Sequence, residues 1–175
     1  MAAGACKDRL ADAIARYGRV PIHCRDVVAE GEHPAFRRPE SAPLWAAGGL
    51  VHDGKDRVLL LRHDPASWWG TRWLTPGGTL EEGETTVDGL RREVMEEVGL
   101  EIDVAWLTRI FNNTLRRGVD VRHTYFAQFV ARARPGEPVC GPDVVEVRWF
   151  GELPVDMSFR DDYLEDFRGL RSARY

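Results

Sequence analysis

Apolar and polar positions along the chain alternate in stretches that predict both strands and helices. Short apolar runs bounded by turn residues favour strands, whereas apolar residues spaced three or four positions apart favour helices. The predicted strands are Leu44–Val51, Arg57–Arg62, Glu101–Phe111, Val119–Ala131 and Val144–Phe150. The predicted helices are Lys7–Tyr17, Thr85–Val98 and Phe159–Leu170. This mixture, in which no internal repeat is visible, predicts one domain of the α+β class.

The first 43 residues are predicted to extend this domain at its N-terminus. A short helix with apolar residues on one side is expected to end at Gly18. Those apolar residues are Leu10, Ile14 and Tyr17. The segment Pro21–Pro43 is rich in charge and proline without a clear period, which indicates a connector. We therefore expect an extension over residues 1–43, to which the pattern gives no role, and a folded domain over residues 44–175.

The helix that begins near Thr85 carries the clearest signals in the chain. Thr85 and Asp88 resemble a capping box, and Gly99 is placed to end the helix. Successive helical residues turn by about 100°, so two neighbouring stripes of side chains are expected. The apolar stripe, expected to face the core, consists of Val87, Leu90, Val94 and Val98. The acidic stripe consists of Glu93, Glu96 and Glu97.

Glutamates are dense in the segment between Gly78 and Leu100. The six are Glu81, Glu82, Glu84, Glu93, Glu96 and Glu97. So many carboxylates repel one another unless cations lie between them, and oxygen ligands suit hard cations such as Mg²⁺. Arg92 is expected on the far side of the helix from the acidic stripe, so it would have to pair off the helix, for instance with Glu84. The segment therefore predicts a site for cations.

Composition narrows the class of protein. The 175 residues suffice for one domain with a core, and 43% hydrophobic with 30% charged residues is ordinary for a soluble protein. A net charge of −4 argues against binding long nucleic acid by charge alone. Three widely spaced cysteines without a CxxC pair indicate neither a disulfide scaffold nor zinc. No apolar run reaches membrane-spanning length, so we expect a cytoplasmic protein without a membrane partner.

The spacing of the glutamate-rich segment resembles the Nudix box of the Nudix hydrolases. That box reads glycine, five residues, Glu, seven residues, Arg-Glu, an aliphatic, any residue, Glu-Glu, any residue, glycine and an aliphatic. Its fixed positions are filled here by Gly78, Glu84, Arg92, Glu93, Val94, Glu96, Glu97, Gly99 and Leu100. The run Trp73–Gly78 also looks like the family's approach to the box. The resemblance implies the Nudix fold, a mixed β-sheet sandwiched between α-helices.

The resemblance also implies a reaction and roles for residues. The reaction is Mg²⁺- or Mn²⁺-dependent hydrolysis of a nucleoside diphosphate linked to a group X, giving a nucleoside monophosphate and phosphorylated X. The residues expected to hold metal are Glu93, Glu96, Glu97 and, through its backbone carbonyl, Gly77. Arg92 is expected to orient the acidic cluster through a salt bridge with Glu84. Glu93 is expected to touch the nucleophilic water, and a carboxylate from a later loop is the alternative base: Glu137, Asp143 or Glu146.

Residues that recognise the substrate are harder to identify from the sequence. Aromatic side chains stack on bases and arginines bind phosphate. The candidates for these contacts are Trp68, Trp69, Arg116 and Arg122. ADP-ribose pyrophosphatases of the family often carry a proline about sixteen residues past the box, where this chain has Arg116. The sequence therefore leaves the base, the sugar and X open.

Two other functional classes are compatible with the resemblance. A Nudix-fold module can bind or sense a nucleotide without cleaving it, but such modules usually lose box glutamates, which this chain retains. A Nudix isomerase acts on an allylic diphosphate and needs a suitably placed catalytic cysteine. The partner expected in the leading interpretation is a small nucleotide or another diphosphate, and the resemblance allows a homodimer.

Overall fold

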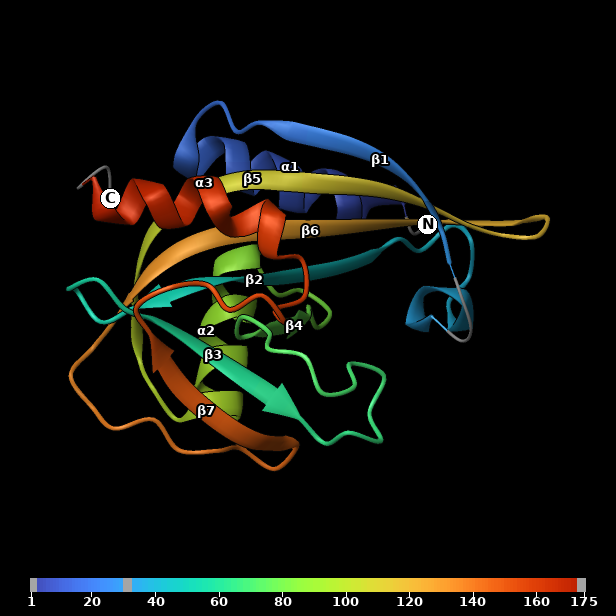
Figure 1. Ribbon diagram of the computed structural model, residues 1–175. Coiled ribbons are helices and arrows are strands. Elements are labelled where there is room, and N and C mark those ends of the chain that lie inside the picture. Colours follow the sequence, from blue (N-terminus) through green and yellow to red (C-terminus); the bar gives the residue numbers. More distant parts are fainter. Residues whose placement is uncertain (1–2, 30–32, 173–175) are drawn as a thin grey trace.

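The fold is organised by one mixed β-sheet (Figure 1). The computed structural model describes residues 3–29 and 33–172. The helices are α1 (Ala3–Tyr17), the short 3-10 helix η1 (Pro34–Arg37), α2 (Thr86–Val98) and α3 (Arg160–Arg171). The strands are β1 (Ile22–Val28), β2 (Leu44–His52), β3 (Val58–His63), β4 (Gly77–Thr79), β5 (Ile102–Arg117), β6 (Asp120–Ala133) and β7 (Val144–Phe150). The strand order is β1-β5-β6-β2-β3-β7, with β4 paired to β2.

Helices cover both faces of this sheet. α1 and α2 contribute to one apolar cluster and α3 contributes to a second, on the opposite face (Figure 1). β1 pairs with β5, and β2 with β6, in parallel, while the remaining pairs are antiparallel. The predicted α+β class and helix–sheet–helix layering are thus confirmed. Within the described residues, no helix is both long and apolar enough to cross a membrane.

The sheet forks between β2 and β3. These two strands pair only at Val51–Leu59 and His52–Val58 among their described residues, and then they diverge. The segment Leu74–Thr79 enters the fork, with a bridge from Leu74 to β3 and the antiparallel pairing of β4 with β2. The backbone of the glutamate-rich segment thus begins inside the sheet, against α2.

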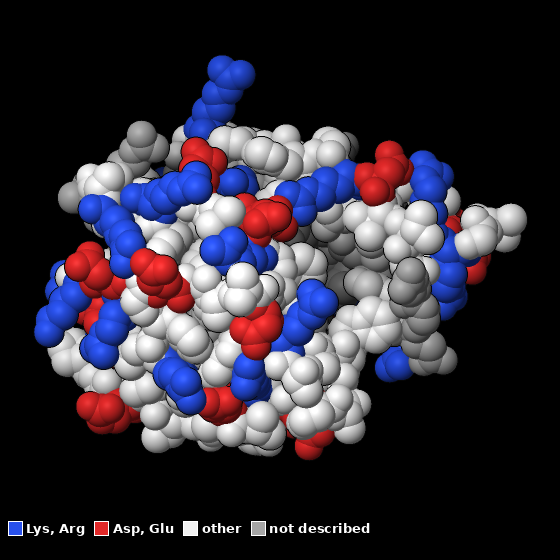
Figure 2. Space-filling model, viewed as in Figure 1, with Lys and Arg blue, Asp and Glu red and all other residues white. Residues whose placement is uncertain are grey.

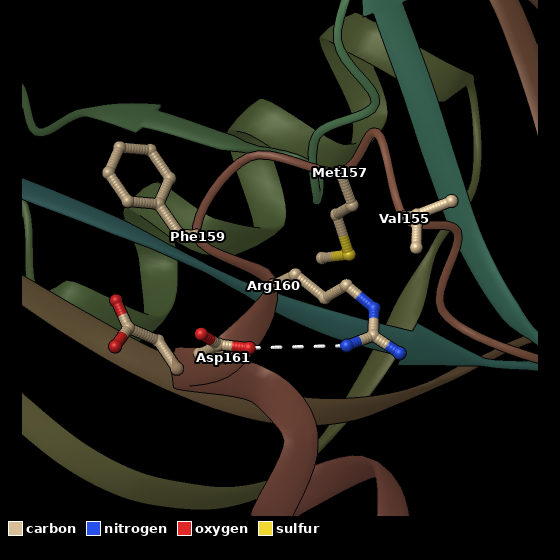
Figure 3. A pocket seen from close by; sticks show the side chains of 6 residues that line it. Val155, Met157, Phe159, Arg160 and Asp161 are labelled. Carbon is tan, nitrogen blue, oxygen red and sulfur yellow. Dashed lines mark ion pairs between the residues drawn. The ribbon is translucent and has the colours of Figure 1, made fainter.

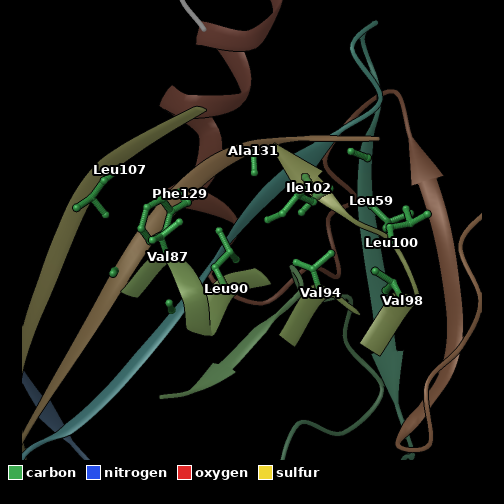
Figure 4. Packing of buried hydrophobic residues seen from close by; sticks show 14 of the residues in the cluster. Leu59, Val87, Leu90, Val94, Val98, Leu100, Ile102, Leu107, Phe129 and Ala131 are labelled. Atoms are coloured by element: carbon green, nitrogen blue, oxygen red, sulfur yellow. The ribbon is translucent and has the colours of Figure 1, made fainter. Parts of the chain in front are cut away.

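The apolar stripe of α2 packs into the core as predicted. Its members, Val87, Leu90, Val94 and Val98, are at most 2% exposed. They contact residues from several strands, among them Phe129, Ile102 and Leu59 (Figure 4). Because this face is fixed by packing, the acidic stripe beside it has a defined position relative to the sheet.

The prediction of an irregular connector after α1 is wrong in part. Residues Ile22–Val28 form β1, which pairs along its whole length with β5, from Ile22–Ile110 to Val28–Arg116. All seven residues of β1 are exposed, so the strand has no apolar period for sequence reasoning to detect. Hydrogen bonds to β5 fix the strand instead. The division of the chain at residue 43 stays a prediction.

Two other local predictions need correction. On α1, Ala13 is fully buried whereas Ile14 is 49% exposed, so the buried face lies along Leu10, Ala13 and Tyr17. In the hairpin, β5 continues beyond Phe111 to Arg117. Its outer part is held by pairing with both β6 and β1, which sustains a strand that the apolar pattern alone does not predict.

The packing of α2 gives a stability prediction. Val94→Ala should lower the free energy of unfolding by about 1–3 kcal/mol, because it leaves a cavity beside fully buried neighbours. Met95→Ala, on the same helix at a residue that is 44% exposed, is the matched control and should change stability little. Urea unfolding followed by circular dichroism measures both, and equal midpoints for the two variants would contradict the assigned core face.

Candidate active site

The termini of α2 are defined by local interactions. Thr85 precedes the helix in an extended conformation, and its hydroxyl oxygen accepts a hydrogen bond from the Asp88 N–H at 3.2 Å. Gly99 ends the helix with a φ of 66°, in the left-handed region. The N–H groups of Val139 and Gly141 then bind the carbonyls of Val98 and Glu97. Both predicted helix signals are confirmed, and a later loop caps the end that carries Glu97.

Glu97 is held between two segments that sequence spacing does not connect. One carboxylate oxygen accepts a hydrogen bond from the Gly77 N–H at 2.8 Å, and the other lies 3.3 Å from His63 Nε2. The other ring nitrogen of His63 lies 3.0 Å from the carbonyl of Asp143. The contact with Glu97 raises the pKa of His63. Sequence reasoning missed His63 because no motif spacing relates it to the box.

Glu93 lies against the backbone of Gly78. A Cβ atom at Gly78 would stand 2.5 Å from the Glu93 carboxylate, so a residue without a side chain permits this close approach. The Glu93 side chain is 14% exposed. Burial raises the pKa of Glu93, the charge of Arg92 opposes this shift, and the charges of Glu97 and Glu96 add to it. The carboxylate is therefore buried beside two like charges, which Arg92 offsets in part.

Arg92 links the carboxylates of the box. It binds Glu84 through two hydrogen bonds of 2.9 and 3.1 Å, as predicted. The expectation that it lies away from the acidic stripe is wrong, because its Nη1 also lies 3.0 Å from both Glu93 and Glu96. Arg92 and Glu96 are one helical turn apart, a spacing at which long side chains on a helix surface meet. A further bond to the Thr79 carbonyl ties it to β4.

Glu84 is the best-compensated carboxylate of this group. Besides Arg92, it accepts a hydrogen bond from the Glu81 N–H at 2.8 Å. The Arg92 guanidinium lowers the pKa of Glu84, which is 13% exposed at its side chain. Glu84 therefore stays ionised and anchors Arg92, a position consistent with the predicted orienting pair.

The donor set of the site suits a hard cation. Arg92 brings one positive charge to Glu84, Glu93 and Glu96, so these three carboxylates keep a net negative charge. In the part of the chain that the structure describes, no three His, Cys, Asp or Glu side chains are gathered as a ready metal site. Glu96 is 58% exposed at its side chain and lies at the outer end of the cluster. The chemistry of the donors fits Mg²⁺ or Mn²⁺, but a metal would have to draw these carboxylates together.

The candidate substrate residues divide into exposed aromatics and paired arginines. Trp68 and Trp69 are 51% and 43% exposed, and Trp68 contacts the ring of His33. Arg116 pairs with Asp26 at 3.1 Å, and Arg122 bonds to the carbonyl of Arg38. Figure 2 shows a hollow beside the extended β5–β6 hairpin on the face that carries α3, with acidic and basic side chains interspersed around it. The assignment of these residues to substrate stays a prediction.

The alternative bases lie in different surroundings. Glu137 and Asp143 have exposed side chains. Glu146 is paired with Arg62 at 3.3 Å and Arg148 at 2.7 Å. Both oxygens of Glu146 are thus engaged by arginines, so the geometry favours Glu93 over Glu146.

A separate hollow of about 380 Å³ lies at the N-terminal end of α3 (Figure 3). It is lined by Val155, Met157, Phe159, Arg160, Asp161 and Asp162. Phe159, 60% exposed, precedes the helix with a φ of 55°. None of the box residues lines this hollow, so it is separate from the residues predicted to carry the chemistry.

Solved structures with this arrangement identify the fold. A Nudix hydrolase from Nitrosomonas europaea superposes with a TM-score of 0.61 at 24% identity, covering 75% of this chain and 72% of the other. A MutT Nudix hydrolase from Burkholderia pseudomallei gives a TM-score of 0.59 at 23% identity, covering 70% and 96%. The sheet and its helices are therefore those of the Nudix fold.

The chain belongs to the Nudix family, since the family's NUDIX domain matches residues 42–162. It is 30% identical over 116 residues to the uncharacterized Nudix hydrolase YvcI of Bacillus subtilis, covering 64% of this chain and 71% of that protein. It is 31% identical over 135 residues to the human 8-oxo-dGDP phosphatase NUDT18, covering 77% of this chain. That alignment spans 38% of the human protein. A MutT-like protein of Streptomyces ambofaciens is 48% identical over 79 residues, and this alignment spans 48% of that protein.

The Glu84–Arg92 pair gives a prediction about stability and pH. The pKa of Glu84 is lowered in the folded protein from the ordinary glutamate value of 4.5. As the pH falls through 4.5, the Glu84 carboxylate is therefore protonated first in the unfolded chain. The pair's contribution is therefore present above that pH and is lost as the pH falls through the lowered pKa. In EDTA, Glu84→Gln should destabilise the protein by about 1–3 kcal/mol near pH 6, and this difference should shrink towards pH 3.

Urea unfolding over this pH range measures the difference between wild type and variant. Glu82→Gln removes the same charge from an exposed position of the same turn and controls for net charge. A Glu84→Gln difference that is constant with pH would contradict the ion pair.

Proposed function

We propose that the protein is a metal-dependent hydrolase of phosphoric anhydride bonds in small nucleotides. A nucleoside diphosphate linked to X would yield a nucleoside monophosphate and phosphorylated X. The observation that carries this proposal is the approach of Glu93 and Glu97 to the Gly77–Gly78 backbone beside Arg92. Carboxylates with little compensating positive charge thus lie next to a glycine backbone. A larger side chain at these glycines would obstruct the approach.

The metal ligands in this proposal are Glu93, Glu96, Glu97 and the Gly77 carbonyl. These residues would hold Mg²⁺ or Mn²⁺, which would offset the diphosphate charge and lower the pKa of bound water. Arg92 contacts one oxygen each of Glu93 and Glu96, so the other oxygen of each carboxylate can face a cation. The Gly77 N–H and His63 fix the orientation of Glu97 from both of its oxygens.

Glu93 is the proposed residue that touches the attacking water. Burial raises its pKa, which brings a carboxylate closer to the range in which it accepts a proton effectively. Arg92, anchored by Glu84, restrains the Glu93 carboxylate on one side, and the Gly78 backbone lies close on the other. A carboxylate of the later loop, Glu137 or Asp143, is the alternative base.

Oxidised purine nucleotides are the substrates that the named relatives suggest. The human relative is named an 8-oxo-dGDP phosphatase, and a Proteus vulgaris protein that is 36% identical over 59 residues is named an 8-oxo-dGTP diphosphatase. Together they suggest 8-oxo-dGDP and 8-oxo-dGTP as first substrates for this chain. The exposed Trp68 and Trp69 are the candidates to stack on the base.

A substrate panel tests this function. Wild type with Mg²⁺ is incubated with 8-oxo-dGTP, 8-oxo-dGDP, dGTP, ADP-ribose, a nucleotide sugar and an allylic diphosphate, with EDTA as control. We expect a nucleoside monophosphate from at least one compound, with pyrophosphate from a triphosphate or phosphate from a diphosphate. Tight binding without any product would indicate the binding or sensor class, and conversion of an allylic diphosphate into its isomer would indicate the isomerase class.

Glu97→Gln tests the metal assignment. We expect kcat to fall by about 10²-fold or more, because the variant loses a charge at the metal, while the far-ultraviolet circular dichroism spectrum stays unchanged. Glu101→Gln, an exposed residue that pairs with Arg134, is the matched control and should keep wild-type turnover. Near-normal turnover by Glu97→Gln would overturn the assignment.

A further inference from the structure

The N-terminal helix α1 reaches the glutamate-rich segment through one side chain. Arg9 donates a hydrogen bond from Nε to the carbonyl of Glu84 at 3.1 Å. It donates a second bond from Nη2 to the carbonyl of Glu81 at 2.5 Å. One planar guanidinium thus binds both ends of the turn from Glu81 to Glu84.

The turn that Arg9 holds is otherwise closed by short local contacts. The Glu84 N–H lies 3.3 Å from the Glu81 carbonyl, and the Glu81 N–H donates to the Glu84 carboxylate at 2.8 Å. Gly83 adopts a φ of 76°, a left-handed conformation that glycine reaches without steric cost and that the turn requires. A bidentate clamp on two of its carbonyls restricts the position from which the Glu84 side chain emerges.

Contacts continue from Glu84 to the proposed metal ligands. The Glu84 carboxylate binds Arg92 twice, and Arg92 in turn contacts Glu93 and Glu96 at 3.0 Å each. A displacement of Glu84 would therefore be transmitted to Arg92, which would then hold the two glutamates differently. The positive charge of Arg9 also favours the ionised form of Glu84.

Apolar packing fixes α1 in the position that this clamp requires. Ala13 is fully buried, and Leu10 and Tyr17 pack against the same cluster as α2. The ring of Tyr17 meets Phe129 edge to face, with centroids 5.8 Å apart. Arg9 therefore projects from a helix docked on the core, and its two bonds transmit the position of that helix to the turn.

We infer that Arg9 is a positioning residue for the proposed hydrolysis and that α1 is part of the catalytic unit. The inference rests on the proposed function, because it gives Arg9 a purpose only if Glu93 and Glu96 hold the metal. It assigns a role to the part of the chain that the sequence left without one. Arg9 contacts two backbone carbonyls of the box turn and acts on the metal ligands through Glu84 and Arg92.

Arg9→Ala, compared with Arg16→Ala, tests the inference. Arg16 lies on the same helix and carries the same charge, but it pairs with Asp12 on α1 itself. We expect Arg9→Ala to lower kcat by about 10–100-fold with little change in KM, as for loss of an outer contact to a metal ligand. Mn²⁺ binding, measured by electron paramagnetic resonance without substrate, should weaken in Arg9→Ala and not in Arg16→Ala. Arg9→Lys, which keeps the charge but not the two-pronged geometry, should restore activity only in part.

A double-mutant cycle separates positioning from general destabilisation. If Arg9 acts through Glu84, the variant Arg9→Ala with Glu84→Gln should have about the same kcat as Glu84→Gln alone. Multiplicative losses of kcat, or wild-type kcat and Mn²⁺ affinity in Arg9→Ala, would overturn the inference. Wild type that hydrolyses no nucleotide of the panel would instead overturn the proposed function, while the Mn²⁺ measurement would still test Arg9.

Discussion

The close approach of the Gly77–Gly78 backbone to the carboxylates of α2 is the contact on which the site depends. It requires the fork between β2 and β3, because only there can β4 pair with β2 while facing the helix. It requires glycine as well: Gly77 has a φ of 149°, and a Cβ atom at Gly78 would collide with Glu93. The apolar stripe of α2 is the third requirement. Its buried valines and leucine fix the helix against the sheet in the position where Glu97 accepts the hydrogen bond from the Gly77 N–H.

Electrostatic repulsion is the cost of this arrangement. Carboxylates gathered on one face of a helix disfavour the folded state; burial raises the pKa of Glu93, and repulsion by Glu97 and Glu96 adds to that shift. Arg92 relieves part of it by bridging Glu84, Glu93 and Glu96, and the Gly77 N–H relieves part at Glu97. The remaining negative charge is available to a ligand cation. If the proposed metal binds here, the site trades stability for affinity, as active sites commonly do.

Sequence reasoning succeeded where the signals were local. The helix caps at Thr85 and Gly99, the buried stripe of α2 and the Glu84–Arg92 pair all follow from spacings within one short segment. It failed where the determinant was a distant partner. β1 is fully exposed and exists through pairing with β5, and His63 meets Glu97 only because β3 and α2 converge at the fork. The reach of Arg92 to Glu93 and Glu96 was missed because helical angles place Cβ atoms and not the ends of long side chains.

The same distinction explains why the sequence predicts the reaction class more clearly than it predicts the substrate. The chemistry of a diphosphate needs a compact set of carboxylates, and one helix with its preceding turn can supply it. Recognition of a base or sugar draws on side chains from separate segments, and the candidates proposed here are Trp68 before the box and Arg116 and Arg122 in the hairpin. Their relative positions depend on β1, η1 and the length of β5, features set by pairing between distant strands. The contact of Arg9 with the box turn belongs to this second kind, since only the docking of α1 on the core brings it there.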